Sequence, residues 1–180
     1  MLRAGKVAFS RFEKIRPYLQ GRVRILDVGS GGGEFAYLLK TLGHDVQGVE
    51  PNRGYAGYAA RQYGLNVTVG FIGDAVLPDE GYDLITIWHV LEHTECPDVV
   101  LRQLRRALRP GGTLVVEVPN VEAICQSPGS TFHEAHLYNF NPAALGLLAA
   151  KAGLHTCMSQ LSPDGGNITA VFRPMPNAAM

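Results

Sequence analysis

Short apolar runs alternate along this chain with longer segments in which apolar residues recur every three or four positions. The short runs, at 23–28, 46–50, 66–69, 82–87 and 113–118, predict buried strands. The helical pattern falls between and around them, at 6–19, 35–42, 53–63, 97–108 and 141–151. Strands that alternate with helices form a parallel sheet covered on both faces, so the pattern predicts an α/β fold.

The last part of the chain predicts a different kind of strand pairing. Two further strands, at 154–161 and 167–173, flank the sequence Pro163-Asp164-Gly165-Gly166, which is typical of a hairpin turn. A hairpin joins antiparallel neighbours, so we expect the sheet to carry an antiparallel edge. Earlier in the chain, Pro110-Gly111-Gly112 predicts a turn, and 119–140 predicts a long loop.

Composition and charge narrow the class of protein. The chain has 180 residues, of which 46% are hydrophobic and 18% charged, and its net charge is zero. These values are typical of one soluble globular domain, which we expect to span 1–180 with its core at about 22–173. A neutral chain gives no support for a nucleic-acid partner or an anionic membrane surface, so we expect neither.

The first 20 residues mix charged and apolar side chains and lack a secretory pattern. No apolar run approaches the roughly 20 residues of a membrane span. We therefore expect a cytoplasmic protein without a membrane span. The cysteines, Cys96, Cys125 and Cys157, lie far apart without the spacing of a metal site, so we expect reduced, buried thiols.

The strongest chemical signal is the loop Asp27-Val28-Gly29-Ser30-Gly31-Gly32-Gly33, between the first strand and the next helix. Glycines there allow positive φ and let a ligand approach the backbone closely. A dinucleotide fingerprint needs a third glycine three residues after Gly31, where this chain has Glu34. An acidic residue ahead of alternating glycines suits a ligand with a cationic amino group instead.

Several ordered blocks carry a resemblance to a known family. They are Leu26-Asp27-Val28-Gly29-Ser30-Gly31-Gly32-Gly33, Gly48-Val49-Glu50-Pro51, Gly73-Asp74-Ala75, Tyr82-Asp83-Leu84-Ile85, His89-Val90-Leu91-Glu92-His93 and Leu108-Arg109-Pro110-Gly111-Gly112-Thr113-Leu114. With these blocks the chain resembles the class I S-adenosylmethionine (SAM)-dependent methyltransferases of the type 11 and type 12 group, over about 22–173. The resemblance implies a Rossmann-like, doubly wound seven-stranded sheet of order 3-2-1-4-5-7-6 with strand 7 antiparallel.

The same resemblance implies SAM as cofactor, S-adenosylhomocysteine as product, and a set of cofactor-binding residues. This set is Asp27, Gly29, Ser30, Gly31, Gly33, Glu50, Pro51, Asp74, Ala75, His89 and Val90. Asp27 is expected to engage the amino group of the cofactor, directly or through water, although it could instead only tie down the loop. Glu50 is expected to accept from the ribose hydroxyls.

For the adenine ring, Asp74 is expected at the amino group, with the backbone N–H of Ala75 donating to the ring. The alternative is that Asp74 is an exposed turn residue. His89 and Val90 are expected to line the methionyl end.

The residues that act on the methyl acceptor are harder to predict from the sequence. His136, followed by Phe140 ahead of a helix, matches a pattern of related methyltransferases, and an imidazole can deprotonate an acceptor near neutral pH. His133 and Tyr138 are further catalytic candidates, with Tyr138 orienting the base. The alternative is that His136 only fixes the loop through backbone contacts.

We expect no metal ion, because neither histidine-containing segment shows a complete ligand pattern. In the first segment the position of Glu92 does not match His-Glu-x-x-His. In the second, His133 and His136 have no obvious further ligands.

These observations favour an enzyme that transfers a methyl group from SAM to an unidentified small-molecule acceptor. Two alternatives stay open at this point. One is a catalytically silent, methyltransferase-like binding or scaffolding subunit. The other is a nicotinamide-dependent enzyme, which the glycine spacing disfavours. The acceptor atom, which could be O, N, C or S, and the oligomeric state are not encoded in any pattern we recognise.

Overall fold

The computed structural model describes residues 2–124 and 136–176, and a mixed sheet forms its centre. The strand order is β3-β2-β1-β4-β5-β7-β6, with β7 antiparallel to both β5 and β6 and the other pairings parallel. This confirms the predicted seven-stranded, Rossmann-like fold. The strands are β1 (Arg24–Val28), β2 (Asp45–Glu50), β3 (Asn66–Val69), β4 (Tyr82–Trp88), β5 (Leu108–Pro119), β6 (Leu154–Leu161) and β7 (Asn167–Pro174).

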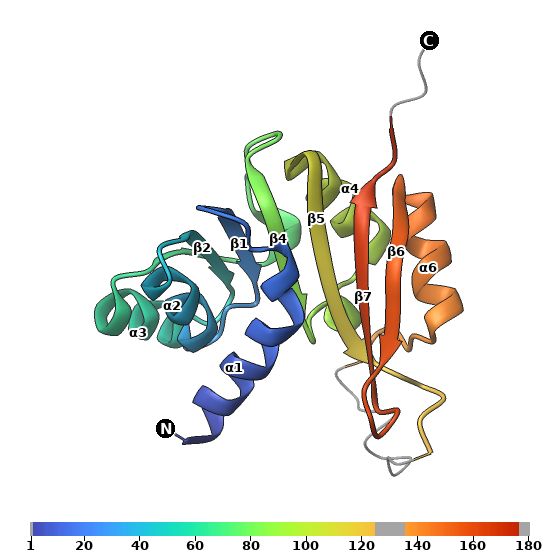
Figure 1. Cartoon of the computed structure of the whole chain (residues 1–180), viewed down its shortest axis with the longest axis horizontal. Helices are drawn as coiled ribbons and strands as arrows, with labels where there is room; N and C mark the ends of the chain where they lie inside the picture. The colour runs from blue at the N-terminus through green and yellow to red at the C-terminus, as the bar shows by residue number, and fades with distance from the viewer. Residues whose placement is uncertain (1, 125–135, 177–180) are drawn as a thin grey trace.

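Helices cover both faces of the sheet (Figure 1). On one face lie α1 (Leu2–Ile15), α2 (Glu34–Thr41) and α3 (Arg53–Tyr63), and on the other lie α4 (Pro97–Ala107) and α6 (Pro142–Lys151). Short 3₁₀ helices follow α1, β3 and β4, namely η1 (Arg16–Tyr18), η2 (Ile72–Asp74) and η3 (Leu91–His93).

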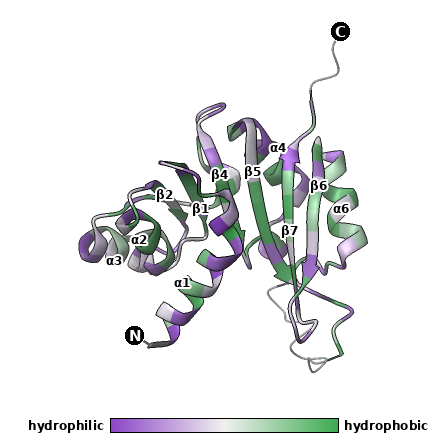
Figure 2. Cartoon of the chain, viewed as in Figure 1, coloured by the Kyte–Doolittle hydropathy of each residue, from purple (hydrophilic) through white to green (hydrophobic). Residues whose placement is uncertain are grey.

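Each strand contributes to two hydrophobic layers, one on each face. In β1, Ile25 packs in the cluster that contains Phe35 of α2, whereas its neighbour Leu26 packs in the cluster that contains Leu101 of α4. Consecutive strand residues point to opposite faces, and both faces are covered, so the strands are apolar throughout. Figure 2 shows the result, with hydrophobic strands between helices that turn polar residues outward.

The first helix differs in its bounds from the predicted 6–19. It begins at Leu2 and ends at Ile15, and the chain then tightens into η1. Pro17 explains this end, because proline lacks the N–H that an α-helix needs and clashes with the preceding turn.

The turn predicted at 110–112 lies within β5 as an irregularity of the pairing. Tyr82 of β4 pairs with Leu108, and the next pair, Leu84 with Thr113, skips the residues between them. Gly111 has a φ of 77°, a conformation that glycine adopts without strain. The turn sequence therefore makes a bulge, and the strand starts earlier than predicted.

The cysteines differ from the expectation of buried thiols. Cys96 and Cys157 are free and exposed, and Cys125 lies outside the described residues. Among the residues that the structure describes, no helix is long and apolar enough to cross a membrane. The extent of the single domain stays a prediction.

Candidate cofactor and acceptor site

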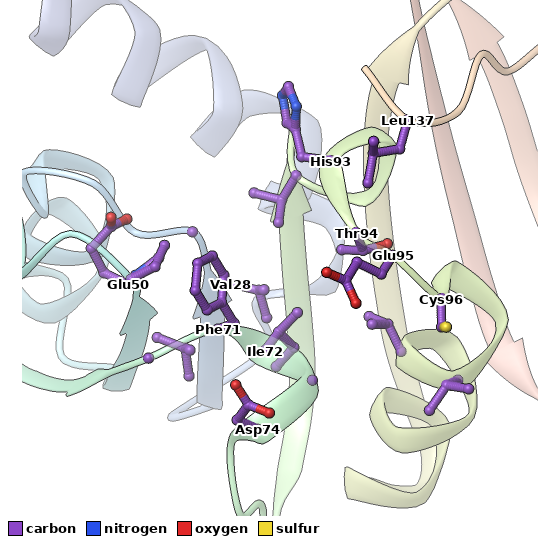
Figure 3. Close-up of a pocket in the computed structure, with 18 of the residues that line it drawn as sticks. Val28, Glu50, Phe71, Ile72, Asp74, His93, Thr94, Glu95, Cys96 and Leu137 are labelled. Carbon is purple, nitrogen blue, oxygen red and sulfur yellow. The ribbon is translucent and has the colours of Figure 1, made fainter. Parts of the chain in front are cut away.

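A pocket of about 630 Å³ opens beyond the carboxyl ends of β1, β2 and β4. In parallel α/β sheets, ligands bind at this edge, where the strand order reverses. Figure 3 shows Glu50 at the left, Phe71 near the centre with Asp74 below it, and His93 and Leu137 toward the top and upper right. The site is therefore built from segments that are far apart in the sequence.

The glycine loop follows β1 and is tied to β2. The N–H groups of Gly29 and Ser30 both donate to the carbonyl of Val49, at 2.8 and 3.2 Å. Gly29 has a φ of 72° and lines the pocket, and a Cβ added there would lie 2.3 Å from Cγ2 of Val90. Only glycine satisfies both the turn and this close approach.

Gly33 lies at the start of α2, in a tightly packed position. It precedes the helix with a φ of 86°, and an added Cβ would meet Leu65 at 2.7 Å and Ala59 at 2.8 Å. Gly33 does not line the pocket. The third glycine of the motif therefore lets α2 pack closely against its neighbours, and its contact with the cofactor stays a prediction.

Glu50 joins the glycine loop to the start of α3. Its carboxylate accepts from the N–H of Gly31 and from the N–H of Asn52, each at 2.8 Å, and its side chain borders the pocket. Asn52 caps α3 by accepting from the N–H groups of Gly54 and Tyr55. Each carboxylate oxygen has a second lone pair, so Glu50 can still accept from ribose hydroxyls.

Asp27 is fully buried beneath the loop. Its Oδ1 accepts from the hydroxyl of Thr86 at 2.8 Å, whereas Oδ2 has no hydrogen-bond partner among the described residues. Burial raises the pKa of Asp27 to about 6, against the lowering effects of the Thr86 bond and the Arg11 charge. The bond to Thr86 ties Asp27 to β4, not to the loop, so the loop-tying alternative is not what the structure shows.

A charged network lies at the end of β4. His89 has a φ of 55°, uncommon for a residue with a Cβ, and its Nε2 lies 3.3 Å from Oε1 of Glu117. Burial alone would lower the pKa of His89, but the carboxylates of Glu117 and Glu92 beside it outweigh burial and raise it to about 9.

Glu117 is held on its other side by Lys14 and by the hydroxyl of Thr169. Burial would raise the pKa of Glu117, but the bonds from His89, Lys14 and Thr169 bring it down to about 2. His89 therefore presents an imidazolium to the pocket.

On the adenine side, Asp74 lines the pocket as expected. Ala75 does not line the pocket and its N–H donates to the carbonyl of Ile72 within η2, so its role at the adenine ring stays a prediction. Phe71, which the sequence did not single out, borders the pocket with 68% of its surface exposed. An exposed aromatic ring there offers a face on which a base can stack.

On the acceptor side, the segment that begins at residue 136 is hydrogen-bonded to η3. The N–H groups of Leu137 and Tyr138 donate to the carbonyl of Glu92, and the Tyr138 hydroxyl donates to the carbonyl of Glu95. That hydroxyl thus donates to the backbone, and its role in orienting His136 stays a prediction. The ring of His136 packs against the ring of His93, and His133 lies outside the described residues.

About half of the residues predicted to bind the cofactor line the pocket, and the others do not. Those that line it are Gly29, Glu50, Pro51, Asp74, His89 and Val90. Asp27, Ser30, Gly31, Gly33 and Ala75 do not line it.

Sequence reasoning also missed two charged residues beside the pocket. Arg11 of α1 stacks its guanidinium 5.3 Å above the ring of Trp88, and Glu117 of β5 holds His89. No local motif marks either residue, because each acts on a partner that only the fold brings near.

Comparisons with known proteins agree with this geometry. A model of the methyltransferase domain family matches residues 3–157. A ubiquinone biosynthesis O-methyltransferase of Agrobacterium fabrum is 31% identical over 117 residues, covering 62% of this chain and 46% of that protein. A tRNA U34 carboxymethyltransferase of Desulfotalea psychrophila is 29% identical over 146 residues, covering 76% and 45%. The chain thus spans about half the length of the curated relatives it matches.

Among solved structures, one similar chain is a 1,6-didemethyltoxoflavin-N1-methyltransferase of Burkholderia thailandensis with bound S-adenosylhomocysteine. It has a TM-score of 0.75 at 19% identity, over 96% of this chain and 79% of that one. At this identity the likeness shows the fold alone.

A Rossmann-like sheet of this strand order, with a glycine loop after β1 and an acidic residue at the end of β2, is typical of a nucleoside-binding α/β protein. With the family match over most of its length, the chain belongs to the methyltransferase domain family. This confirms the resemblance drawn from the sequence, and with it an enzyme family that uses SAM as cofactor.

Proposed function

We propose that this chain transfers a methyl group from SAM to a small-molecule acceptor. The observation that carries the proposal is the continuity of one pocket, from Glu50 and Asp74 to the rim at His93 and Leu137. A single cavity of about 630 Å³ falls in the range of small-molecule sites, about 300–1,000 Å³. It offers room for a nucleoside at one end and for a small acceptor at the other.

The residues fit SAM on grounds that the structure supplies. The unpartnered Oδ2 of Asp27 suits a cationic amino group, Glu50 suits ribose hydroxyls, and the backbone of Gly29 lines the pocket. When bound, SAM supplies a methyl group on a positively charged sulfur. The work left to the chain is to hold the acceptor in line at about 3–3.5 Å and to exclude water.

The acceptor end of the pocket is lined by Val99, Val100 and Leu137, together with Thr94 and Cys96. An apolar wall with a few polar groups suits an uncharged or aromatic molecule more than a polyanion. We therefore place a small molecule there rather than tRNA, although one relative is named for action on tRNA. The cytoplasmic location expected from the sequence stays a prediction.

A labelling experiment tests the proposal. The chain is incubated with methyl-labelled SAM and, separately, with a small-molecule extract and with purified RNA, and label is followed by mass spectrometry. The expected result is a new labelled small molecule, together with saturable binding of S-adenosylhomocysteine but not of NAD. Label in RNA alone would reject the acceptor class, and tight S-adenosylhomocysteine binding without any product would favour the scaffolding alternative.

We assign His136 to the acceptor, not to the cofactor, because it lies beside His93 at the far rim from Glu50. In His136→Ala, the affinity for S-adenosylhomocysteine should stay within about threefold, a difference of roughly 0.65 kcal/mol. The kcat should fall at least about tenfold, a floor below the usual effect of losing a general base. His155→Ala, an exposed histidine on β6, is the control, and it should leave both quantities unchanged.

A further inference from the structure

One buried carboxylate stands among histidines from different segments of the chain. Glu92 is 1% exposed, and neither of its carboxylate oxygens has a hydrogen-bond partner among the residues that the structure describes. Buried charges in proteins are normally paired, hydrogen-bonded or bound to a metal ion. The buried carboxylate of Glu92, which accepts no hydrogen bond from the described residues, is therefore expected to have a charged partner or a bound metal ion.

Two imidazoles lie beside this carboxylate. Nε2 of His93 is 3.8 Å from Oε1 of Glu92, and the rings of His93 and His136 are 4.9 Å apart in a T-shaped arrangement. One ligand atom from each of Glu92, His93 and His136 lies within 4.8 Å of the other two. His136 comes from the segment after β5, so the fold completes a set that neither sequence segment contains.

We propose that Glu92, His93 and His136 bind a divalent transition-metal ion, with zinc the best fit, and that the ion keeps an open position toward the acceptor pocket. Two histidines and one carboxylate are a ligand set of catalytic zinc sites, in which the fourth position is left for water or substrate. His93 lines the pocket, so that position would face the acceptor. The proposal departs from the sequence-based expectation that no metal is bound.

The distances need only a small rearrangement of side chains. Ligand atoms about 2.0–2.2 Å from a tetrahedral zinc ion lie roughly 3.3–3.6 Å apart, closer than the 4.8 Å limit within which the three atoms now lie. The side chain of His93 is 40% exposed, so its ring has space to rotate toward the carboxylate. The backbone is already in place, because Leu137 and Tyr138 donate to the carbonyl of Glu92.

A purely electrostatic account competes with the metal site. Nδ1 of His89 lies 3.6 Å from Oε1 of Glu92, so protonated histidines could balance the carboxylate without an ion. However, His89 also lies against Glu117 at the shorter distance of 3.3 Å. Of the two carboxylates, Glu117 is the better partnered, and Glu92 is the one with both oxygens unsatisfied.

The use of the ion in turnover rests on the proposed function, whereas its binding does not. An acceptor hydroxyl bound at the open position would have a lowered pKa, and its proton would pass to water. The oxygen lone pair would then form the bond to the methyl carbon as the carbon–sulfur bond breaks, leaving a neutral thioether. His136 would act as a ligand, and the ion would replace it as the group that activates the acceptor.

Metal binding to the whole chain tests the proposal without any turnover. The metal-free protein is titrated with Co²⁺, whose visible absorption reports coordination, and with Zn²⁺ in a calorimeter. We expect one ion per chain and no sulfur-to-cobalt charge-transfer band. Glu92→Gln, His93→Ala and His136→Ala should each weaken binding at least about tenfold, because losing even an outer-shell partner costs about 10–100-fold.

His155→Ala is the matched control, because His155 lies 3.4 Å from the thiol of Cys157 and these two side chains could also attract a metal ion. Three results would overturn the proposal and leave a histidine–carboxylate cluster only. They are loss of the ion in His155→Ala, no metal binding to the wild type, and wild-type affinity in all three ligand variants. Circular dichroism on the same samples checks folding. S-adenosylhomocysteine binding to the folded wild type separates the two proposals, since its absence would reject the methyltransferase function and not the metal site.

Discussion

Replacing Asp27 with asparagine tests how the cofactor is held, because this substitution removes the charge and keeps the shape. Asp27 is fully buried, with Oδ1 bonded to Thr86 and Oδ2 without a partner among the described residues. The cofactor and its product both carry an amino group that stays largely protonated below pH 7, since α-amino groups titrate near pH 8. Only the ionised form of Asp27 pairs with that ammonium.

The magnitude follows from the pKa of Asp27, which burial raises to about 6. The folded-state pKa is raised, so the carboxylate is about nine-tenths ionised at pH 7 and only about one-tenth at pH 5. The affinity for S-adenosylhomocysteine should therefore fall about tenfold over this range, roughly 1.4 kcal/mol. His89 and Glu117 titrate outside it, with pKa values of about 9 and about 2.

The assay is calorimetric titration with S-adenosylhomocysteine at several pH values, on wild type and Asp27→Asn. At pH 7 the variant should bind more weakly by about 1.5–3 kcal/mol, the scale of a hydrogen bond to a charged group. Comparing the two proteins at each pH removes the effects of other titrating groups. The ratio of the dissociation constants of Asp27→Asn and wild type should fall about tenfold between pH 7 and pH 5.

Thr86→Val sharpens the test, because the Thr86 bond lowers the pKa of Asp27. Removing this bond should move the pH midpoint of binding upward. A ratio of the dissociation constants of Asp27→Asn and wild type that is the same at pH 5 and pH 7 would refute the reasoning. Asp27 would then be a buried structural group, and the amino group would be held elsewhere.

Two further substitutions probe the loop around the cofactor. Glu50→Ala should weaken S-adenosylhomocysteine binding by about 1.5–3 kcal/mol by calorimetry, and an unchanged affinity would show that Glu50 only holds the loop through Gly31. Gly33→Ala should lower the free energy of unfolding by about 2–4 kcal/mol, because a strained φ adds to the overpacking against Leu65. Gly21→Ala, with a φ of 69° and open space, is the control, and chemical denaturation should find it less destabilising, at about 1–2 kcal/mol.

The sequence was sufficient for the fold and for much of the cofactor site. Short apolar runs and helical spacing are set by local burial, so a strand predicted at 23–28 is observed at Arg24–Val28. The glycine loop and Glu50 were equally readable, because a backbone turn and a strand end fix their positions from neighbouring residues alone. The strand order came from the family resemblance, since local patterns do not specify which strands pair.

Only the tertiary structure decided which side chains meet across the sheet. Nothing near Asp27 in the sequence indicates that Thr86 would bond it, and nothing in the acceptor segment indicates that His136 would lie against His93. It also assigned different tasks to equivalent glycines, with Gly29 facing the pocket and Gly33 the packing of α2. The physical reason is that hydrogen bonds, charge pairs and metal ligation act over a few ångströms in space. Sequence patterns record only what neighbours along the chain impose, so contacts between distant segments appear only once the sheet has brought them together.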